Sequence, residues 1–147
     1  MPGVLVAGIG NIFLGDDGFG SEVVRRLPDL GPGVRVVDYG IRGVHLAYDL
    51  LDGVDELILI DAIPSRGAPG TVHVIKANAG TGGSLDAHAM DPATVFASLA
   101  ALGGTLPRTL VVGCEASDTD EGIGLSPPVA AAVDRAAEIV SQLARAG

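Results

Sequence analysis

The stretch VLVAGIGNIFLGDDGFGSEVVRRL, residues 4–27, joins an apolar run to an amphipathic segment through a glycine-rich turn. Residues 4–10 are apolar up to their closing glycines, which predicts a buried β-strand. In residues 19–27, Phe19 and Val23 lie one helical turn apart, with charged residues between the apolar ones, which predicts a short helix with one apolar face. A strand followed at once by a helix is half of a β-α-β unit, so the stretch predicts an α/β fold.

The rest of the chain continues the alternation of strands and helices. We predict further strands at 34–40, 56–62, 71–76 and 109–115, and further helices at 44–51, from Pro92 and from Pro127. The run ELILIDA, 56–62, is almost continuously apolar, which is typical of a central parallel strand covered on both faces. The strand 71–76 follows its predecessor without a helix-length connection, so we expect it to run antiparallel at an edge.

Helical spacing also predicts which side chains face the core. The residues expected to face inward are Val44, Tyr48 and Leu51 in the second helix, Val95, Leu99 and Leu102 in the third, and Val129, Val133, Ala136, Val140 and Leu143 in the last. Asp91-Pro92 and Ser126-Pro127 each place a capping side chain before a proline, a combination that favours the start of a helix.

These elements predict one three-layer α/β/α sandwich over residues 1–147, with about four helices and a mostly parallel five-stranded sheet. Right-handed crossovers favour the strand order 2-1-3-5, with strand 4 antiparallel at the edge. The connections after strands 1 and 3 then lie on opposite faces, and a crevice opens at the carboxyl ends of these strands. Asp16 and Asp17 follow strand 1 and Asp61 ends strand 3, so carboxylates are expected at that crevice.

Composition excludes several classes of function. The net charge is −9, from nine Lys and Arg against eighteen Asp and Glu, and only 3% of residues are aromatic. Both values argue against nucleic-acid binding. No apolar segment is long enough to span a bilayer and the start lacks a signal-peptide pattern, so we expect a cytoplasmic protein without membrane contact. Cys114 is the only cysteine and is expected to be buried rather than nucleophilic.

The glycine-rich turn has three interpretations: a phosphate-binding loop, a metal site, or a tight turn in which Asp17 caps the first helix or complements its dipole. Residues 8–10 begin a dinucleotide-binding G-x-G-x-x-G pattern, but Phe13 stands in place of the third glycine. That glycine allows the helix to pack closely on the strand, and a phenylalanine side chain would block this contact. Asp16 and Asp17 would repel a pyrophosphate. Asp38 lies where a ribose-binding acid would lie, so nucleotide binding stays a minor alternative.

The metal interpretation rests on carboxylates at neighbouring strand ends, which need a cation or a shared proton. A histidine would complete a mixed oxygen and nitrogen site of the kind that suits nickel, zinc or manganese. Of the three histidines, only His88 lies in the long irregular segment 77–90, where Asp86 would orient its imidazole. Asp61 as a turn acceptor and His88 as a solvated residue are the simpler alternatives. The sequence has no standard serine or cysteine nucleophile motif and no H-E-x-x-H motif.

Four segments, in order along the chain, resemble the [NiFe]-hydrogenase maturation endopeptidases. They are VLVAGIGNIFLGDDGFG, LILIDAIPSRGAPGTV, DAHAMDPATVFASL and TLVVGCEASDTDEGIGLSPPVAAAV, and together they cover nearly the whole chain. The resemblance implies an endopeptidase that removes the C-terminal extension of a hydrogenase large-subunit precursor after nickel insertion. It implies a monomer whose partner is that precursor.

The resemblance also implies the site residues. Asp17, Asp61 and His88 would be both the metal-binding and the catalytic residues, with nickel carried by the substrate. Asp17 stands where many members have Glu, so its side chain is one methylene shorter, and either the site is tighter or Asp16 helps it. Two alternatives stay open: a non-catalytic nickel-checking chaperone of the same fold, and a small nucleotide-binding domain.

Overall fold

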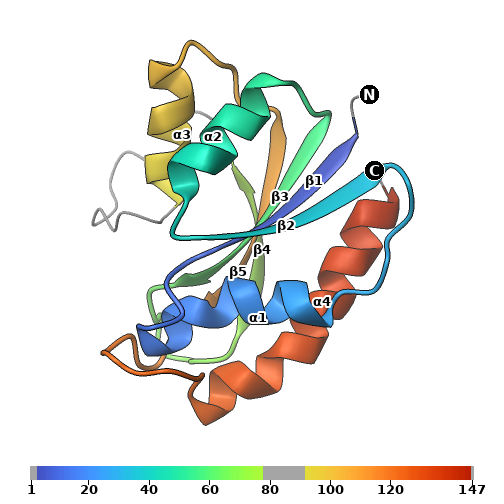
Figure 1. The fold of residues 1–147 in the computed structure, drawn as a ribbon. Coiled ribbons are helices and arrows are strands. Elements are labelled where there is room, and N and C mark those ends of the chain that lie inside the picture. Colours follow the sequence, from blue (N-terminus) through green and yellow to red (C-terminus); the bar gives the residue numbers. More distant parts are fainter. Residues whose placement is uncertain (1–2, 78–91, 147) are drawn as a thin grey trace.

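The computed structural model describes residues 3–77 and 92–146 (Figure 1). The strands are β1 (Val4–Ile9), β2 (Val34–Gly40), β3 (Glu56–Ile63), β4 (Val72–Ala77) and β5 (Arg108–Glu115). The helices are α1 (Phe19–Arg26), α2 (Gly43–Leu51), α3 (Pro92–Ala101) and α4 (Pro127–Ala146), and a 3-10 helix, η1 (Gly15–Gly18), precedes α1. Within the described ranges, no helix is long and apolar enough to cross a membrane.

All five strands form one sheet in the order β2-β1-β3-β5-β4. The pairs β1–β2, β1–β3 and β3–β5 are parallel, and β4 pairs antiparallel with β5. The predicted strand order and the antiparallel edge strand are therefore confirmed. Helices α1 and α4 cover one face of the sheet, and α2 and α3 cover the other, which confirms the predicted three layers (Figure 1).

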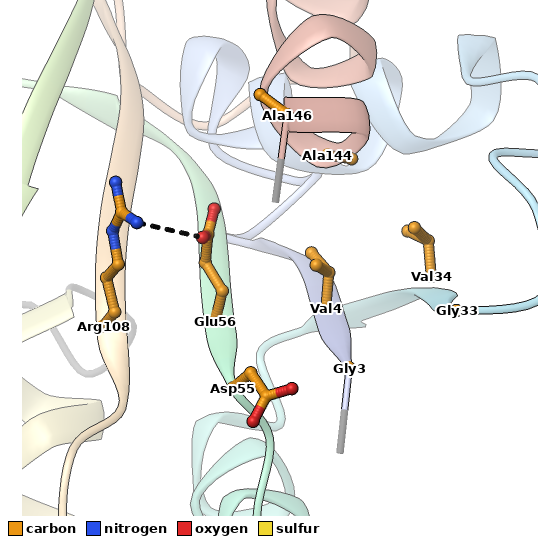
Figure 2. A pocket seen from close by; sticks show the side chains of 9 residues that line it. All are labelled: Gly3, Val4, Gly33, Val34, Asp55, Glu56, Arg108, Ala144 and Ala146. Carbon is orange, nitrogen blue, oxygen red and sulfur yellow. Dashed lines mark ion pairs between the residues drawn. The ribbon is translucent and has the colours of Figure 1, made fainter. Parts of the chain in front are cut away.

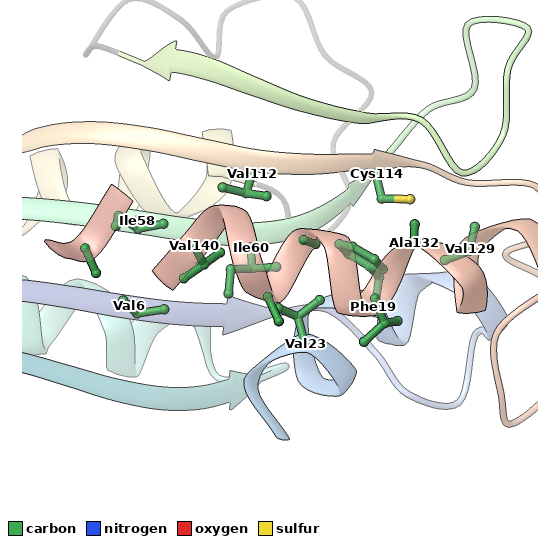
Figure 3. Close-up of a cluster of buried hydrophobic side chains, with 14 of the residues drawn as sticks. Val6, Phe19, Val23, Ile58, Ile60, Val112, Cys114, Val129, Ala132 and Val140 are labelled. Atoms are coloured by element: carbon green, nitrogen blue, oxygen red, sulfur yellow. The ribbon is translucent and has the colours of Figure 1, made fainter. Parts of the chain in front are cut away.

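Each face of the sheet carries its own buried apolar cluster. Val6, Ile58 and Val112 point toward α1 and α4, where they meet Phe19 and Val140 (Figure 3). The alternate residues of the same strands point toward α2 and α3. Because successive side chains of a strand point to opposite faces, a strand buried on both sides must be apolar throughout. This explains the continuous apolar runs of β1 and β3.

Helix α2 presents a different face to the core than its spacing predicted. Val44, Tyr48 and Leu51 are exposed at 57%, 55% and 42%, so their predicted inward placement is wrong. Leu46 and Leu50 are buried instead. Both sets recur at helical spacing, so the periodicity of this segment cannot separate them. The packing of α2 against α3 and the sheet selects the face.

The other helices agree better with the predicted faces. In α3, Val95 and Leu99 are buried as predicted, whereas Leu102 follows the end of the helix and is exposed. The predicted cap Asp91 lies outside the described residues. Helix α4 begins at Pro127 as predicted, with Val129, Val133, Ala136 and Val140 buried and Leu143 partly buried.

Two glycines bring α1 into close contact with the sheet. A Cβ on Gly20 would overlap the carbonyl oxygen of Ile60 and lie 2.6 Å from that of Ile9. A Cβ on Gly8 would lie 2.6 Å from the carbonyl oxygen of Gly20. Phe13 is 60% exposed and takes no part in this contact. The glycines therefore hold the start of α1, and with it η1, against the carboxyl ends of β1 and β3.

Candidate functional site

Acidic side chains gather where three neighbouring strands end. Asp16 and Asp17 belong to η1, which follows β1, while Asp61 lies near the end of β3 and Glu115 is the last residue of β5. β3 lies between β1 and β5 in the sheet, and η1 contacts β3. The sheet thus brings the predicted residues Asp17 and Asp61 to the same edge, at the carboxyl ends where α/β proteins bind ligands.

Asp17 is half-buried and is oriented by the backbone. Its Oδ2 accepts a hydrogen bond of 2.7 Å from the N–H of Asn11. The N-cap of α1 is Gly18, which makes no side-chain cap bond, so Asp17 as the cap of the first helix is wrong. Gly10 makes room for this turn, because its φ is +130° and a Cβ there would overlap the carbonyl oxygen of Asp17.

Asp16, the adjacent residue, is fully buried and bonds to a different segment of the chain. Its carboxylate accepts hydrogen bonds from Ser117 N–H, Asp118 N–H, Ser126 N–H and Ser126 Oγ–H at 2.7–2.8 Å. Burial alone would raise the pKa of Asp16, but the donors on Asp118, Ser126 and Ser117 outweigh it and lower the pKa. Both oxygens accept hydrogen bonds from the loop 117–126, and the predicted help of Asp16 to Asp17 in binding a metal stays a prediction.

Asp61 is 3% exposed and lies near the carboxyl end of β3, a central strand of the sheet. It is paired in register with Gly113 of β5, and its neighbour Ile60 is paired with Gly8 of β1. His88 and Asp86 lie outside the described residues, so His88 as the third ligand and Asp86 as its partner stay predictions. In the part of the chain that is described, no three His, Cys, Asp or Glu residues are grouped so as to hold a metal ion.

Glu115 is a second buried anchor that the sequence analysis did not single out. Its Oε1 accepts hydrogen bonds from the N–H groups of Arg66 (2.7 Å) and Ala68 (3.1 Å), and its Oε2 lies 2.7 Å from His73 Nε2. The hydrogen bond to His73, followed by that from Arg66, holds the pKa of Glu115 below its usual value. Glu115 follows an apolar run, as Asp61 does in LILIDA of β3. The same pattern, an acid at the end of an apolar strand, would therefore also have predicted Glu115.

Two other candidates are occupied or inert. Asp38 Oδ1 accepts hydrogen bonds from Ser21 Oγ–H of α1 (2.8 Å) and from Gly40 N–H (3.1 Å), so it links the end of β2 to α1. This use weakens the nucleotide-binding alternative. Cys114 is buried beside α4, as predicted (Figure 3). Burial raises the pKa of its thiol to about 11, and such a protonated thiol is a poor nucleophile.

A cavity of about 580 Å³ lies at the opposite end of the parallel strands, where they begin (Figure 2). It is lined by the first residues of β1, β3 and β5, namely Val4, Glu56 and Arg108, together with the end of α4. Glu56 and Arg108 approach each other only to 3.9 Å. Neither Asp17 nor Asp61, the two predicted site residues that the structure describes, lines this cavity.

Comparison with known proteins gives one consistent result. The family model of hydrogenase maturation proteases matches residues 22–143. The hydrogenase 2 maturation protease of Escherichia coli is 32% identical, over 93% of this chain and 87% of its own. The hydrogenase expression/formation protein HupD of Rhodobacter capsulatus is 32% identical, over 95% and 70%. The solved structure of the hydrogenase maturating endopeptidase HybD from E. coli has a TM-score of 0.78 at 30% identity, covering 99% of this chain and 94% of that one.

Proposed function

Because the chain belongs to the hydrogenase maturation protease family, we propose that it removes the C-terminal extension of a [NiFe]-hydrogenase large-subunit precursor. Family membership makes the chain a hydrolase, since the relatives are named as maturation proteases and endopeptidases. The observation that carries the proposed reaction is that Asp17, in η1 after β1, and Asp61, near the end of the adjacent strand β3, lie at the same end of the sheet.

In this proposal the nickel arrives with the precursor and identifies it as mature enough to be cut. Asp17 and Asp61 supply carboxylate oxygens and His88 supplies an imidazole nitrogen, a donor set that suits nickel. The Asn11 N–H fixes one oxygen of Asp17 and so presets the direction of its carboxylate. The burial of Asp61 favours a cation beside it, because a low local dielectric strengthens attraction between opposite charges.

Cleavage requires an attacking water and a polarised carbonyl group. Burial raises the pKa of the Cys114 thiol and makes it a poor nucleophile, which favours direct attack by water. Two routes fit these residues. Either the substrate's nickel polarises the scissile carbonyl or activates the water, or one carboxylate acts as general base while the nickel holds the tail in place.

The decisive experiment compares nickel-loaded and nickel-free precursor with the purified chain, using mass spectrometry to detect the released tail. We expect release from the loaded precursor only. Binding without release would identify a nickel-checking chaperone instead, and equal cleavage of both forms would remove nickel from the recognition step. His88→Ala tests the third ligand, and we expect it to abolish release.

The proposal includes a cytoplasmic monomer that meets its partner without a membrane or nucleic acid. The net charge of −9 supports the absence of a nucleic-acid partner, because phosphate backbones repel an acidic surface. Light scattering of the purified chain, alone and mixed with precursor, measures both the resting state and the stoichiometry of the complex. We expect one chain at rest and a 1:1 complex.

A further inference from the structure

We propose that Asp16 is a positioning residue, whose buried carboxylate ties the loop 117–126 to η1 and thereby fixes the carboxylate of Asp17. The link between this role and peptide cleavage rests on the proposed function. The anchoring itself rests on hydrogen bonds between described residues and stands independently of the reaction.

The contacts of Asp16 form a complete anchor. Oδ1 accepts the N–H of Ser126, and Oδ2 accepts the N–H groups of Ser117 and Asp118 and the hydroxyl of Ser126. The backbone N–H of Asp16 donates to the carbonyl of Asp118 at 2.8 Å. One residue therefore holds both ends of a loop about a hundred positions away in the sequence, because Ser117 follows the end of β5 and Ser126 precedes α4.

The backbone on either side strengthens the same junction. Gly15 N–H donates to the carbonyl of Gly122 at 2.9 Å, and Gly122 N–H donates to the carbonyl of Phe13 at 2.9 Å. The 3-10 helix η1 has only four residues and no side-chain cap bond at its start. So short a helix has little stability of its own, and its position depends on contacts outside it.

Asp17 takes its position from this anchored turn. Asp16 and Asp17 are adjacent, yet Asp16 is fully buried in the junction while Asp17 is half-buried and bonded to Asn11. If η1 shifts, the Asp17 carboxylate shifts with it. A displacement of about 1 Å at a reacting group can slow catalysis about 100-fold, so a small movement here is sufficient to be measured.

Only a carboxylate satisfies this set of donors. An asparagine side chain in place of Asp16 has one acceptor oxygen, and its NH₂ group would face at least one N–H of Ser117, Asp118 or Ser126. Asp16→Asn therefore removes one acceptor oxygen and places an NH₂ donor against a backbone N–H donor, without changing the size of the side chain. It is the sharpest test of the anchor.

The experiment compares Asp16→Asn with Val140→Ala, which opens a void in the buried core of α4 away from the carboxyl edge. Both variants are assayed well below their melting temperatures on nickel-loaded precursor. We expect kcat of Asp16→Asn to fall about 10- to 100-fold with KM nearly unchanged. Val140→Ala should keep the wild-type kcat, and Ser126→Ala, which removes one donor, should show a smaller fall than Asp16→Asn.

A second readout does not depend on activity. The amide of Asn11 donates to Asp17, so its hydrogen exchange reports the position of that carboxylate. We expect this exchange to accelerate about tenfold in Asp16→Asn and to stay unchanged in Val140→Ala. Unchanged Asn11 exchange in Asp16→Asn, or equal losses of kcat in both variants, would overturn the positioning role.

Failure of the two proposals would look different. If the wild-type chain releases no tail, the proposed function fails, while Asn11 exchange still decides whether Asp16 positions Asp17. If Asp16→Asn does not fold, Ser126→Ala carries the same two readouts, with an accelerated Asn11 amide as the expected result and an unchanged one as the contradicting result.

Discussion

The carboxyl ends and the amino ends of the parallel strands, the carboxyl edge and the amino edge, use acidic residues in different ways. At the carboxyl edge, Asp16 and Glu115 each accept several short hydrogen bonds from a neighbouring loop. At the amino edge, Glu56 lies 3.9 Å from Arg108, whose side chain is 65% exposed, beside an open cavity (Figure 2). Hydrogen bonds to a buried charge restrain both partners, whereas an ion pair of 3.9 Å restrains an exposed arginine little, even though Glu56 itself is buried.

This contrast shows that the cavity and the proposed catalytic site need not lie at the same end of the strands. The cavity beside Glu56 is lined by the first residues of the strands, and neither Asp17 nor Asp61 reaches it. The edge with Asp17 and Asp61 has firmly held turns on both sides, from Asp16 and from Glu115. Catalysis requires groups held in a defined geometry, so the carboxyl edge is the stronger candidate.

The largest effect is expected from Asp61→Asn at the carboxyl edge. Loss of this charge should lower kcat/KM for tail release at least about 1000-fold, since the proposed function makes Asp61 a metal ligand or a general base. Its counterpart at the amino edge is Glu56→Gln, which should keep kcat/KM within about twofold of wild type at a temperature where the variant is folded. The measurement is the rate of tail release by mass spectrometry. Wild-type processing by Asp61→Asn would show that the reactive edge is misassigned.

The next effect concerns the close contact that places η1. Gly20→Ala should lower the free energy of unfolding by about 2–3 kcal/mol, because its Cβ would meet backbone oxygens that cannot move aside. The matched control is Gly33→Ala at the amino edge, where an added Cβ meets nothing within 4 Å. It should change the free energy by less than about 0.5 kcal/mol in urea unfolding. Equal losses in the two variants would contradict the close approach of α1.

A third test uses pH to separate an anchored acid from a surface acid. The pKa of Glu115 is lowered in the folded chain, so its stabilising contribution is present above its unfolded pKa of about 4.3 and disappears as pH falls through the folded value. Glu115→Gln should destabilise the chain most at neutral pH and flatten the dependence of unfolding free energy on pH in acid. Glu138→Gln, at an exposed position of α4, serves as the control. Parallel pH curves for wild type and Glu115→Gln would contradict the anchor.

The strand order was predictable because it follows from features that are local in sequence. The apolar runs of β1 and β3 and the short connection before β4 fix which strands are central and which lies at the edge. The inward face of α2 was not predictable in this way, since Val44 and Leu46 are both apolar and helical spacing allows either set. Contacts between distant elements decide such cases.

The site was predictable only in part for the same reason. Asp16 and Asp17 are identical in chemistry, and nothing local distinguishes the anchor from the candidate ligand. The difference arises from Ser117, Asp118 and Ser126, which approach Asp16 from the other end of the chain. The strand-end position of Asp61 was predicted by pattern alone, whereas His88 as its partner stays a prediction.

The smallest effect is expected at the amino edge itself. Arg108→Gln removes the 3.9 Å ion pair with Glu56, and we expect the free energy of unfolding to change by less than about 0.5 kcal/mol because the pair is long and Arg108 is largely solvated. Urea unfolding at low and high salt measures it, and tail release should stay at the wild-type rate. A loss as large as that of Gly20→Ala would mean that the amino edge is held as firmly as the carboxyl edge. The contrast between the edges would then no longer support the carboxyl edge as the proposed site.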